Sequence, residues 1–456
     1  MIDCYQFVVI GITPTVHRLE DSGVGSILDY AAEADVIVDN SEYVQLVEDV
    51  VENKVKVRVY HYLDEDMCDK HRDTFINCIR AARTASSPNA KCFAAVKVTA
   101  LGNPDLLKAM STTLVEFRKL YFRLNPDNKP FLTKQEFALR FADIFESDFA
   151  SDELYDILDK NNDGMVDLAD WMNNIHIDQI HTLITDHCQD KYGPLSVAAL
   201  DEEETKLYAV MADRLRALAK VAKENNVRIM IDAEQTYFQP AIDYLTNELM
   251  EKYNDGPYPV IFGTYQMYLK DSMDRLQLDI SRAERYNYKF AAKLVRGAYL
   301  VTEGKYAADR GFPHPVHDSI EDTHANYNAG VNYVLTKIAP HVQNAKDEDD
   351  RSGIEIMFAS HNQHTMELAV SKMQELDLSP TDSGVYFGQL LGMVDHITNT
   401  LGFHNYRSYK YVPYGKISEV MPYLIRRGVE NSDALGGATK EISFIIDELK
   451  RRVFST

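Results

Sequence analysis

Lys97 and Asp232 each lie on a segment with the pattern of a β-strand. Successive side chains of a strand alternate between its two faces, and this places both charged groups on the same side of the predicted sheet. In segment 92–101 (CFAAVKVTAL), Lys97 lies opposite an apolar face that can pack on helices. In segment 227–232 (VRIMID), Asp232 falls at the end of the run. A buried ammonium needs a counter-charge, so we expect Asp232 to be the partner of Lys97. The alternative is an ion pair that only fills the interior of the protein.

The segment 416–430 (KISEVMPYLIRRGVE) carries two adjacent arginines beside an apolar helical stripe. The apolar residues recur at helical spacing, so we expect the stripe to be buried. Arg426 and Glu430 lie one turn apart on the opposite face, and Arg427 lies near the edge of the stripe. This pattern is typical of a solvent-exposed ion pair. Adjacent guanidinium groups also match a planar carboxylate, because their donors can grip two oxygens.

Polar residues follow an apolar strand in segment 358–365 (FASHNQHT). Ser360 and His361 are adjacent on a strand end and face opposite ways, and no G-x-S-x-G motif accompanies them, which argues against nucleophilic hydrolysis. Together with Asn362 they are better suited to polar contacts with a bound cofactor. The chain lacks G-x-G-x-x-G and Walker motifs. We therefore expect any dinucleotide to be held by barrel loops and not by a Rossmann turn.

Segment 159–170 (DKNNDGMVDLAD) matches a calcium-binding EF-hand loop at most of its ligand positions and at its turn glycine. Its last position holds an aspartate, which is shorter than the usual glutamate. An upstream segment, 125–136, resembles a degenerate partner loop without the glycine. We expect one weak divalent site, and a purely structural helix-loop-helix is the alternative. The candidate ligands are Asp159, Asn161, Asp163, Met165 and Asp170.

Eight β-rich segments alternate with helical patterns and predict parallel β-α units. Eight such units favour a closed (βα)₈ TIM-like barrel, and an open doubly wound sheet is the alternative. The long interval after the second strand predicts a helical EF-hand-like insertion at 103–195, which divides the barrel into 1–102 and 196–456. The expected strands are 26–30, 92–101, 227–232, 259–265, 289–299, 354–361, 384–389 and 409–414.

The composition excludes several classes of partner and processing. The chain has 48 Lys and Arg against 70 Asp and Glu, a formal charge of −22, which disfavours nucleic acid. No stretch is long and apolar enough for a membrane span, and the first residues show no targeting or signal pattern. Five cysteines without a C-x-x-C pair predict reduced thiols and no thiolate zinc site.

Four of these motifs together resemble the proline dehydrogenase family. They are IDAEQ (231–235), KLVRGAY (293–299), FASHNQHT (358–365) and RR-x-x-E (426–430), in the family's order. The resemblance runs from Ser26 to the C-terminus and is interrupted by the insertion. The insertion and the segment YKYVPYGKISEV (409–420) are similar to the animal mitochondrial enzymes. The resemblance implies a barrel that oxidises a cyclic amino acid at its mouth.

The resemblance also assigns roles to individual residues of this chain. It implies that Lys97, Arg426 and Arg427 clamp the carboxylate of proline, with Glu33 as a gate partner of Arg426 and Glu430 completing the helical motif. Asp232 would hold Lys97, while Tyr299, Leu390 and Tyr411 would wall the substrate ring. Bacterial enzymes commonly carry arginine at the position of Lys293, so the surroundings of the flavin differ here. The implied flavin contacts are Tyr265, Gln266, Lys293, Arg296, Gly297, Ala298, Ser360, His361, Asn362 and Gln389.

The function implied by the resemblance is the oxidation of L-proline to 1-pyrroline-5-carboxylate. The implied cofactor is noncovalent FAD, and ubiquinone would receive the electrons at the matrix side of the mitochondrial inner membrane, through a peripheral association. Oxidation of trans-4-hydroxyproline is an alternative activity, although Tyr411 narrows the space it requires. A calcium-responsive binding protein with an inert barrel is a second alternative, which would give the insertion the main role.

Overall fold

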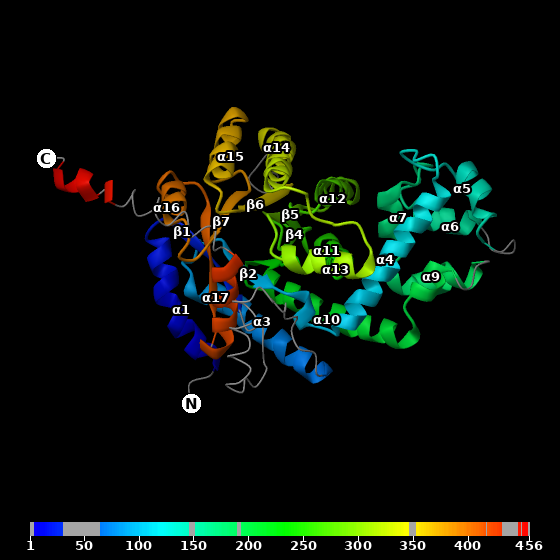
Figure 1. Cartoon of the computed structure of the whole chain (residues 1–456), viewed down its shortest axis with the longest axis horizontal. Coiled ribbons are helices and arrows are strands. Elements are labelled where there is room, and N and C mark those ends of the chain that lie inside the picture. The colour runs from blue at the N-terminus through cyan, green and yellow to red at the C-terminus, as the bar shows by residue number, and fades with distance from the viewer. Residues whose placement is uncertain are drawn as a thin grey trace.

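Eight parallel strands close into a barrel in which each strand pairs with its neighbours in sequence and β1 pairs with β8 (Figure 1). The computed structural model describes residues 4–30, 64–145, 151–188, 193–345, 353–415, 417–430, 446–447 and 449–454. The closed barrel is confirmed, and the open sheet is excluded. The strands are β1 (Val24–Tyr30), β2 (Cys92–Val96), β3 (Val227–Ile231), β4 (Ile261–Gln266), β5 (Phe290–Val295), β6 (Ile354–Ala359), β7 (Val385–Leu390) and β8 (Ser408–Tyr414).

The strands are nearly continuous apolar runs because both of their faces are buried. Side chains on the inner face fill the middle of the barrel, where aromatic rings such as Phe93 and Tyr386 meet edge to face at 5.3 Å. This filled layer separates the two ends of the barrel, so a ligand can only reach the polar residues beyond the strand ends. The layer consists of Ile27, Phe93, Met230, Phe262, Ala291, Met357, Tyr386 and Tyr409.

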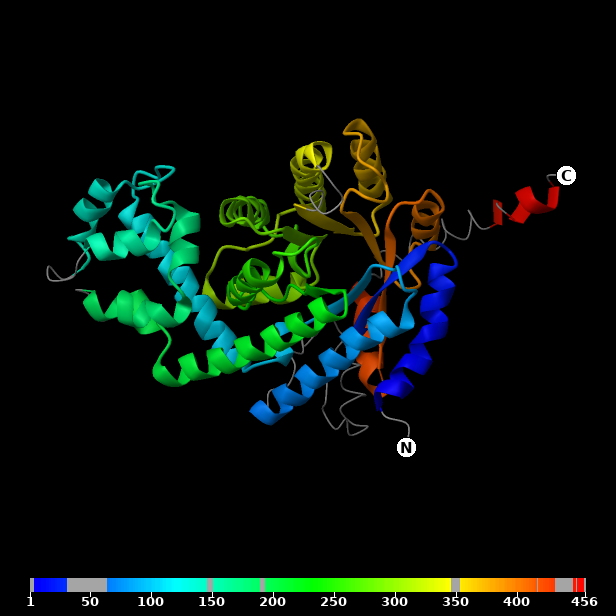
Figure 2. The same cartoon turned by 180° about the vertical axis from the view of Figure 1, so that it is seen from behind.

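Helices cover the outside of the barrel and bury the other face of each strand. Figure 2 shows α3 and α10 side by side along one flank. The capping box of Asp201 and Glu204 starts α10. The helices of the barrel are α1 (Cys4–Glu20), α3 (Glu65–Ala85), α10 (Glu202–Glu224), α11 (Gln239–Tyr253), α12 (Ser272–Tyr286), α13 (Leu300–Arg310), α14 (Ile320–Asn344), α15 (Gln363–Glu375), α16 (Asp395–Phe403) and α17 (Ile417–Glu430).

A helical unit stands out from the barrel between β2 and β3 (Figure 1). The ring of Trp171 stacks on Phe117 at 4.7 Å, and its indole nitrogen donates to the Phe117 carbonyl over 2.9 Å. This fully buried tryptophan packs in a cluster that is continuous with the outer core of the barrel. Its helices are α4 (Pro104–Leu124), α5 (Lys134–Phe141), α6 (Ser151–Leu158), α7 (Leu168–Asn174), α8 (Ile180–Leu183) and α9 (Pro194–Ala198).

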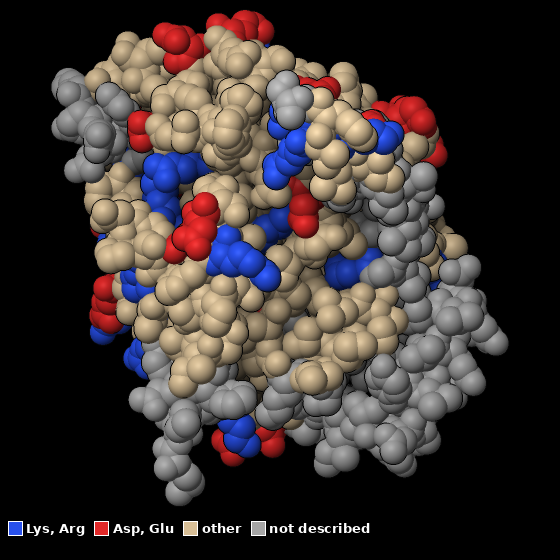
Figure 3. Space-filling model, turned by 90° about the vertical axis from the view of Figure 1, so that its left-hand side faces the viewer, with Lys and Arg blue, Asp and Glu red and all other residues tan. Residues whose placement is uncertain are grey.

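The surface carries both signs of charge. On the face shown in Figure 3, Lys and Arg side chains are interspersed with Asp and Glu, and the coloured residues form no continuous basic surface. This agrees with the acidic composition of the chain. Within the described ranges, no helix has both the length and the hydropathy that crossing a bilayer requires.

Candidate active site at the mouth of the barrel

Inward-facing residues at the carboxyl ends of β3, β5 and β8 form one hydrogen-bonded group. Lys293 donates to Asp232 Oδ1 over 2.6 Å, and the Tyr411 hydroxyl donates to Asp232 Oδ2 over 3.0 Å. The Lys293 ammonium lies 5.5 Å from the centre of the Tyr411 ring. The side chains of Lys293 and Asp232 are only 7% and 13% exposed. This ion pair is largely desolvated, so both charges are held in fixed positions.

Lys97 follows β2 and lies at the same end of the barrel, and its expected pairing with Asp232 stays a prediction. Both oxygens of Asp232 accept hydrogen bonds from the other two members of the group. The positive charge of Lys97 acts on Asp29 and Glu234, where it opposes the effect of burial on the pKa of each carboxyl group. Burial raises the pKa of the Tyr299 hydroxyl, and the charge of Lys97 opposes that rise. Lys97 therefore lies among three groups of the mouth.

Asp29, at the end of β1, belongs to this group and was missed from the sequence. It lies two residues after Ile27, which faces the inside of the barrel, so alternation continues the inward face to Asp29. Its side chain is 3% exposed, and its Oδ2 has no hydrogen-bond partner among the described residues. Burial raises the pKa of Asp29 to about 6. The inward alternation of the first strand was the signal available to find it.

Glu234 is a second acidic residue that the sequence analysis did not select. Its carboxylate accepts from the Thr99 hydroxyl over 2.6 Å and from the Thr99 amide over 3.2 Å. Burial raises its pKa. Gln266, an expected flavin contact at the end of β4, donates to the Glu234 carbonyl over 2.8 Å. These bonds tie the ends of β2, β3 and β4 together.

Arg296, just after β5, is a half-buried cation with neutral partners. It donates to the hydroxyl groups of Ser360 and Thr365, the latter over 2.9 Å, and to His324 Nδ1 over 3.3 Å. Its guanidinium carbon lies 4.5 Å from the centre of the Tyr327 ring. In the described part of the chain no carboxylate pairs with Arg296. Burial lowers its pKa, and an anionic ligand would offset that cost.

The loop from Ser360 to Asn362 joins β6 to α15. A hydrogen bond also connects this loop to the end of β7. The Leu390 amide donates to His361 Nε2 over 3.1 Å, and the Asn362 side chain caps α15 by accepting from an amide over 2.9 Å. Buried Gln389 accepts from Thr398 over 2.9 Å. The expected cofactor residues of this region therefore converge at the strand ends.

The β5 to α13 loop requires glycine at its turn. Gly297 has φ +138°, and an added Cβ would lie 2.4 Å from the Tyr268 ring. Ala298 and Tyr299 follow, and Tyr299 is the N-cap residue of α13. Burial raises the pKa of Tyr299 to about 12, and the charges of Lys97 and Arg427 oppose that rise. This loop brings the Tyr299 ring between the strand ends and α17.

Helix α17 follows β8 and lies at the end of the barrel from which that strand leaves (Figure 1). Arg427 is half-buried, and its guanidinium carbon lies 5.4 Å from the centre of the Tyr423 ring. The charges of Asp29, Arg427 and Lys97 all act on the Tyr423 hydroxyl. Arg427 is thus part of the mouth and not of a solvent-exposed face. Arg426 and Glu430 lie on the same helix, while Glu33 lies outside the described residues.

Tyr265 is an expected flavin residue that the structure places elsewhere. Its hydroxyl donates to Asp279 on α12 over 2.7 Å, and its ring packs in the outer core against Phe290. Alternation along β4 turns the neighbouring Thr264 and Gln266 inward and Tyr265 outward. We therefore remove the Tyr265 side chain from the candidate cofactor contacts.

The expected metal loop, 159–170, forms a turn that is held by hydrogen bonds among its own residues. The Asp159 carboxylate accepts from two loop amides over 3.0 Å each, and the Met165 amide donates to Asp163 Oδ1 over 2.8 Å. Asn161 donates to Asp163 over 2.9 Å. Asp170 faces the barrel and forms an ion pair with Arg285 there. The described residues contain no group of three or more His, Cys, Asp or Glu placed to hold a metal ion.

A cavity of about 490 Å³ lies between α15 and α16, outside the barrel. Its lining contains none of the predicted site residues. The residues that combine charge, burial and aromatic walls are those at the strand ends. That arrangement can fix an anionic group on cations beside a flat, partly apolar surface.

Comparison with known proteins gives one consistent result. The family model for proline dehydrogenase matches residues 12–440. Proline dehydrogenase 1, mitochondrial, from Homo sapiens is 36% identical over 480 residues, covering 97% of this chain and 78% of the relative. The Drosophila melanogaster protein of the same name is 33% identical over 483 residues, covering 97% of this chain and 70% of the relative.

A hydroxyproline dehydrogenase from Xenopus laevis is 40% identical over 256 residues, covering 56% of this chain and 53% of the relative. Among solved structures, proline utilization A from Bdellovibrio bacteriovorus, inactivated by N-propargylglycine, aligns with a TM-score of 0.58 and 17% identity. It covers 93% of this chain, which spans about a third of that structure's length (31%). This likeness supports the barrel fold.

Proposed function

Because the chain belongs to the proline dehydrogenase family, we propose that it oxidises L-proline to 1-pyrroline-5-carboxylate with FAD as cofactor. One observation carries the proposal: at the mouth of the barrel the Lys293 ammonium lies 5.5 Å from the centre of the Tyr411 ring, and the Arg427 guanidinium carbon lies 5.4 Å from the centre of the Tyr423 ring. Two cations beside aromatic rings suit a small molecule that combines a carboxylate with an apolar ring.

The proposed clamp for the carboxylate consists of Lys97, Arg426 and Arg427. Tyr299, Leu390 and Tyr411 wall the pyrrolidine ring, and the bond from Tyr411 to Asp232 fixes the plane of one wall. A clamp of fixed charges orients the ring carbon on the side of the nitrogen away from the carboxylate, which is the carbon that loses hydride. Lys97 would also place positive charge near the substrate amine. Positive charge favours the neutral amine, which must release its proton as the C–N bond becomes C=N.

The residues around Arg296 fit FAD. A half-buried guanidinium whose partners are hydroxyl groups and a histidine is suited to an anionic or oxygen-rich part of a cofactor. Glycine at position 297 allows the turn that carries Ala298 to pass beside the Tyr268 ring. When bound, FAD supplies a two-electron acceptor for the substrate hydride. The other proposed contacts are Gln266, Lys293, Ala298, Ser360, His361, Asn362 and Gln389.

We propose ubiquinone as the final electron acceptor and the matrix side of the mitochondrial inner membrane as the location. The support is the naming of the animal relatives as mitochondrial proteins that match nearly the whole chain. The described helices include none suited to span a bilayer, so the proposed contact with the membrane is peripheral.

Oxidation of trans-4-hydroxyproline is the second candidate activity. The relative with that name is 40% identical, which favours it, but the match covers 56% of the chain. The proline dehydrogenases match 97% of it, including the insertion. Tyr411 also occupies a fixed place beside the proposed ring site. We therefore favour proline.

A steady-state assay with a soluble quinone analogue tests the proposal. We expect turnover with L-proline and accumulation of 1-pyrroline-5-carboxylate, detected by trapping the cyclic imine. The kcat/KM for trans-4-hydroxyproline, measured in parallel, should be lower. FAD-loaded protein that produces no imine from either substrate would refute the proposed activity.

A further inference from the structure

The Asp159–Asp170 loop of the insertion has the sequence pattern of an EF-hand loop and forms a turn held by hydrogen bonds within the insertion. Its first residue, Asp159, accepts from the amides of Asp163 and Gly164 over 3.0 Å each, and Gly164 has φ +75°. Val166 pairs with Leu132 through two backbone bonds of 2.8 and 3.0 Å. The amino-terminal half of the loop therefore closes on its own hydrogen bonds.

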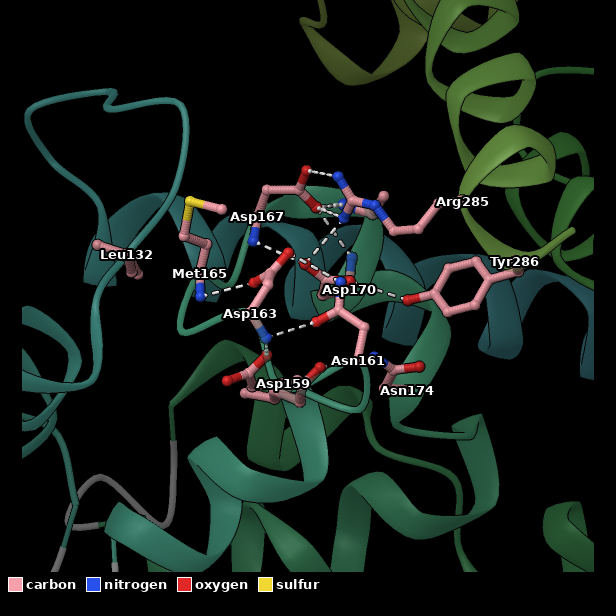
Figure 4. A network of polar contacts seen from close by, with 12 residues as sticks. Leu132, Asp159, Asn161, Asp163, Met165, Asp167, Asp170, Asn174, Arg285 and Tyr286 are labelled. Carbon is pink, nitrogen blue, oxygen red and sulfur yellow. Dashed lines mark hydrogen bonds and ion pairs between the residues drawn. The ribbon is translucent and has the colours of Figure 1, made fainter.

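The carboxyl-terminal half of the loop is closed by a cation from the barrel (Figure 4). Arg285 on α12 donates to both oxygens of Asp167 over 2.7 and 2.6 Å, and its Nη1 lies 2.8 Å from Asp170 Oδ2. The neighbouring Tyr286 hydroxyl donates to Asp170 Oδ1 over 2.9 Å. Asp167 and Asp170 stand at the ninth and twelfth positions, where an EF-hand loop contributes to its metal.

These contacts use the carboxylate that a metal would require. The Asp170 side chain is 3% exposed, and its Oδ2 also accepts from the Asp167 amide over 3.1 Å. A buried carboxylate needs matched charge, and the two-pronged guanidinium supplies it. The hydrogen bonds to Asp167 raise the pKa of Arg285 above its ordinary value, so this cation stays charged. A divalent ion at the twelfth position would have to displace it.

We propose that Arg285 serves as the built-in cation of this loop, so that docking of the loop on α12 and binding of an oxygen-coordinated divalent ion such as Ca²⁺ exclude each other. In this arrangement the loop is a joint between insertion and barrel. Other contacts also hold the insertion, including a bond of 3.2 Å from the Ile177 amide to the Tyr244 hydroxyl on α11. Loss of the joint alone should therefore leave the fold intact. The inference does not depend on the proposed enzymatic activity.

Titration calorimetry with calcium chloride tests this exclusion on the full-length, FAD-loaded protein. The test variant is Arg285→Gln. The matched control is Lys337→Gln on α14, which removes a surface pair with Glu284, the residue that precedes Arg285 on α12. We expect Arg285→Gln to bind one Ca²⁺ on the order of tenfold more tightly than the wild type, because no guanidinium must be displaced. The control should bind like the wild type.

Equal calcium affinity in the wild type and Arg285→Gln would overturn the proposal, and so would the absence of binding in both. An equal gain in the control would overturn it as well. Arg285→Lys keeps the positive charge but loses the paired guanidinium donors that bind both oxygens of Asp167. This variant provides the test if Arg285→Gln fails to fold. We expect Arg285→Lys to bind Ca²⁺ more tightly than the wild type, and an unchanged affinity would again overturn the exclusion.

Discussion

The ionisable side chains at the mouth interact electrostatically with partners on other strands of the barrel. Asp232 on β3 is neutralised by Lys293 on β5, while Lys97 acts on Asp29 and Glu234. The proposed substrate carboxylate would join this group of charges.

The arginine clamp is tested by Arg426→Ala and Arg427→Ala. Each removes a proposed charged hydrogen-bond donor to the substrate carboxylate, at a cost of about 1.5–3 kcal/mol of binding. We expect the KM for proline to rise by at least about tenfold in each variant. The thermal midpoint should change little, as in Arg216→Ala, a control at a surface pair. An unchanged KM in both variants would assign the arginines to the surface.

The wall formed by Tyr411 is tested by comparing serine with phenylalanine. Tyr411→Ser opens space beside the ring, so we expect the kcat/KM ratio of hydroxyproline to proline to rise by about tenfold. Tyr411→Phe keeps the ring and loses only the bond to Asp232. It should lower activity on both substrates without changing their ratio. If serine leaves the ratio unchanged, Tyr411 is not the wall.

Asp29 predicts a pH-dependent stability. Because its pKa is raised to about 6 from 3.8, the folded protein retains a proton that the unfolded chain releases. The contribution of this proton to the free energy of unfolding is fully present below about pH 4 and is lost as the pH rises through about 6. We expect Asp29→Asn to be more stable than the wild type above about pH 6, by on the order of 1–3 kcal/mol. Denaturant unfolding across this pH range measures the difference.

The control for Asp29→Asn is Asp213→Asn, at a carboxylate that is 76% exposed. A stability gain that is the same at both ends of the pH range, or that appears equally in the control, would contradict the assigned role of burial.

The residue chemistry was only partly predictable. Alternation along two strands placed Lys97 and Asp232 at the mouth, because period two fixes which face a strand residue occupies. It did not identify Lys293 as the partner of Asp232, because partners that meet across a barrel depend on side-chain reach and not on spacing. Tyr265 shows the same limit, since the resemblance supplied the residue and only the direction of β4 shows that it faces α12.

At the scale of elements, strand ends and the loops that follow them position the site. All eight predicted strands are present, although β2 ends at Val96 and continues as a 3₁₀ turn at Val98–Ala100. Apolar runs predict strands well when both faces are buried. The position of α17 at the barrel mouth could not be predicted from its own periodicity. The polar residues at the edge of its apolar stripe have the same spacing whether they are half-buried against a neighbouring element or exposed to solvent.

The turn after β5 is tested by Gly297→Ala. The change puts a side chain into a left-handed conformation and onto the Tyr268 ring, so we expect a cost of about 1–3 kcal/mol and weaker retention of flavin. Gly256→Ala is the control, because its added Cβ meets nothing within 4 Å. Thermal unfolding and the flavin-to-protein absorbance ratio provide the readouts. Full flavin content and wild-type stability in Gly297→Ala would contradict this account.

At the scale of the whole molecule, the insertion and the barrel are joined where the sequence predicted a metal. The loop pattern identified the turn, but the cation comes from α12, more than one hundred residues away along the chain (|i−j| = 118). No local pattern can report such a partner. The acidic composition and the mixture of charges in Figure 3 agree with a small-molecule substrate.

The most direct test of the proposed activity is an anaerobic titration of the purified protein with L-proline, followed by visible absorption. We predict that the protein carries about one noncovalent FAD per chain and that L-proline bleaches its absorption, because the residues at the strand ends hold substrate and cofactor together. The bleached flavin should regain its colour when a quinone is added. A folded protein that does not take up FAD, or a bound flavin that L-proline leaves oxidised, would contradict the account.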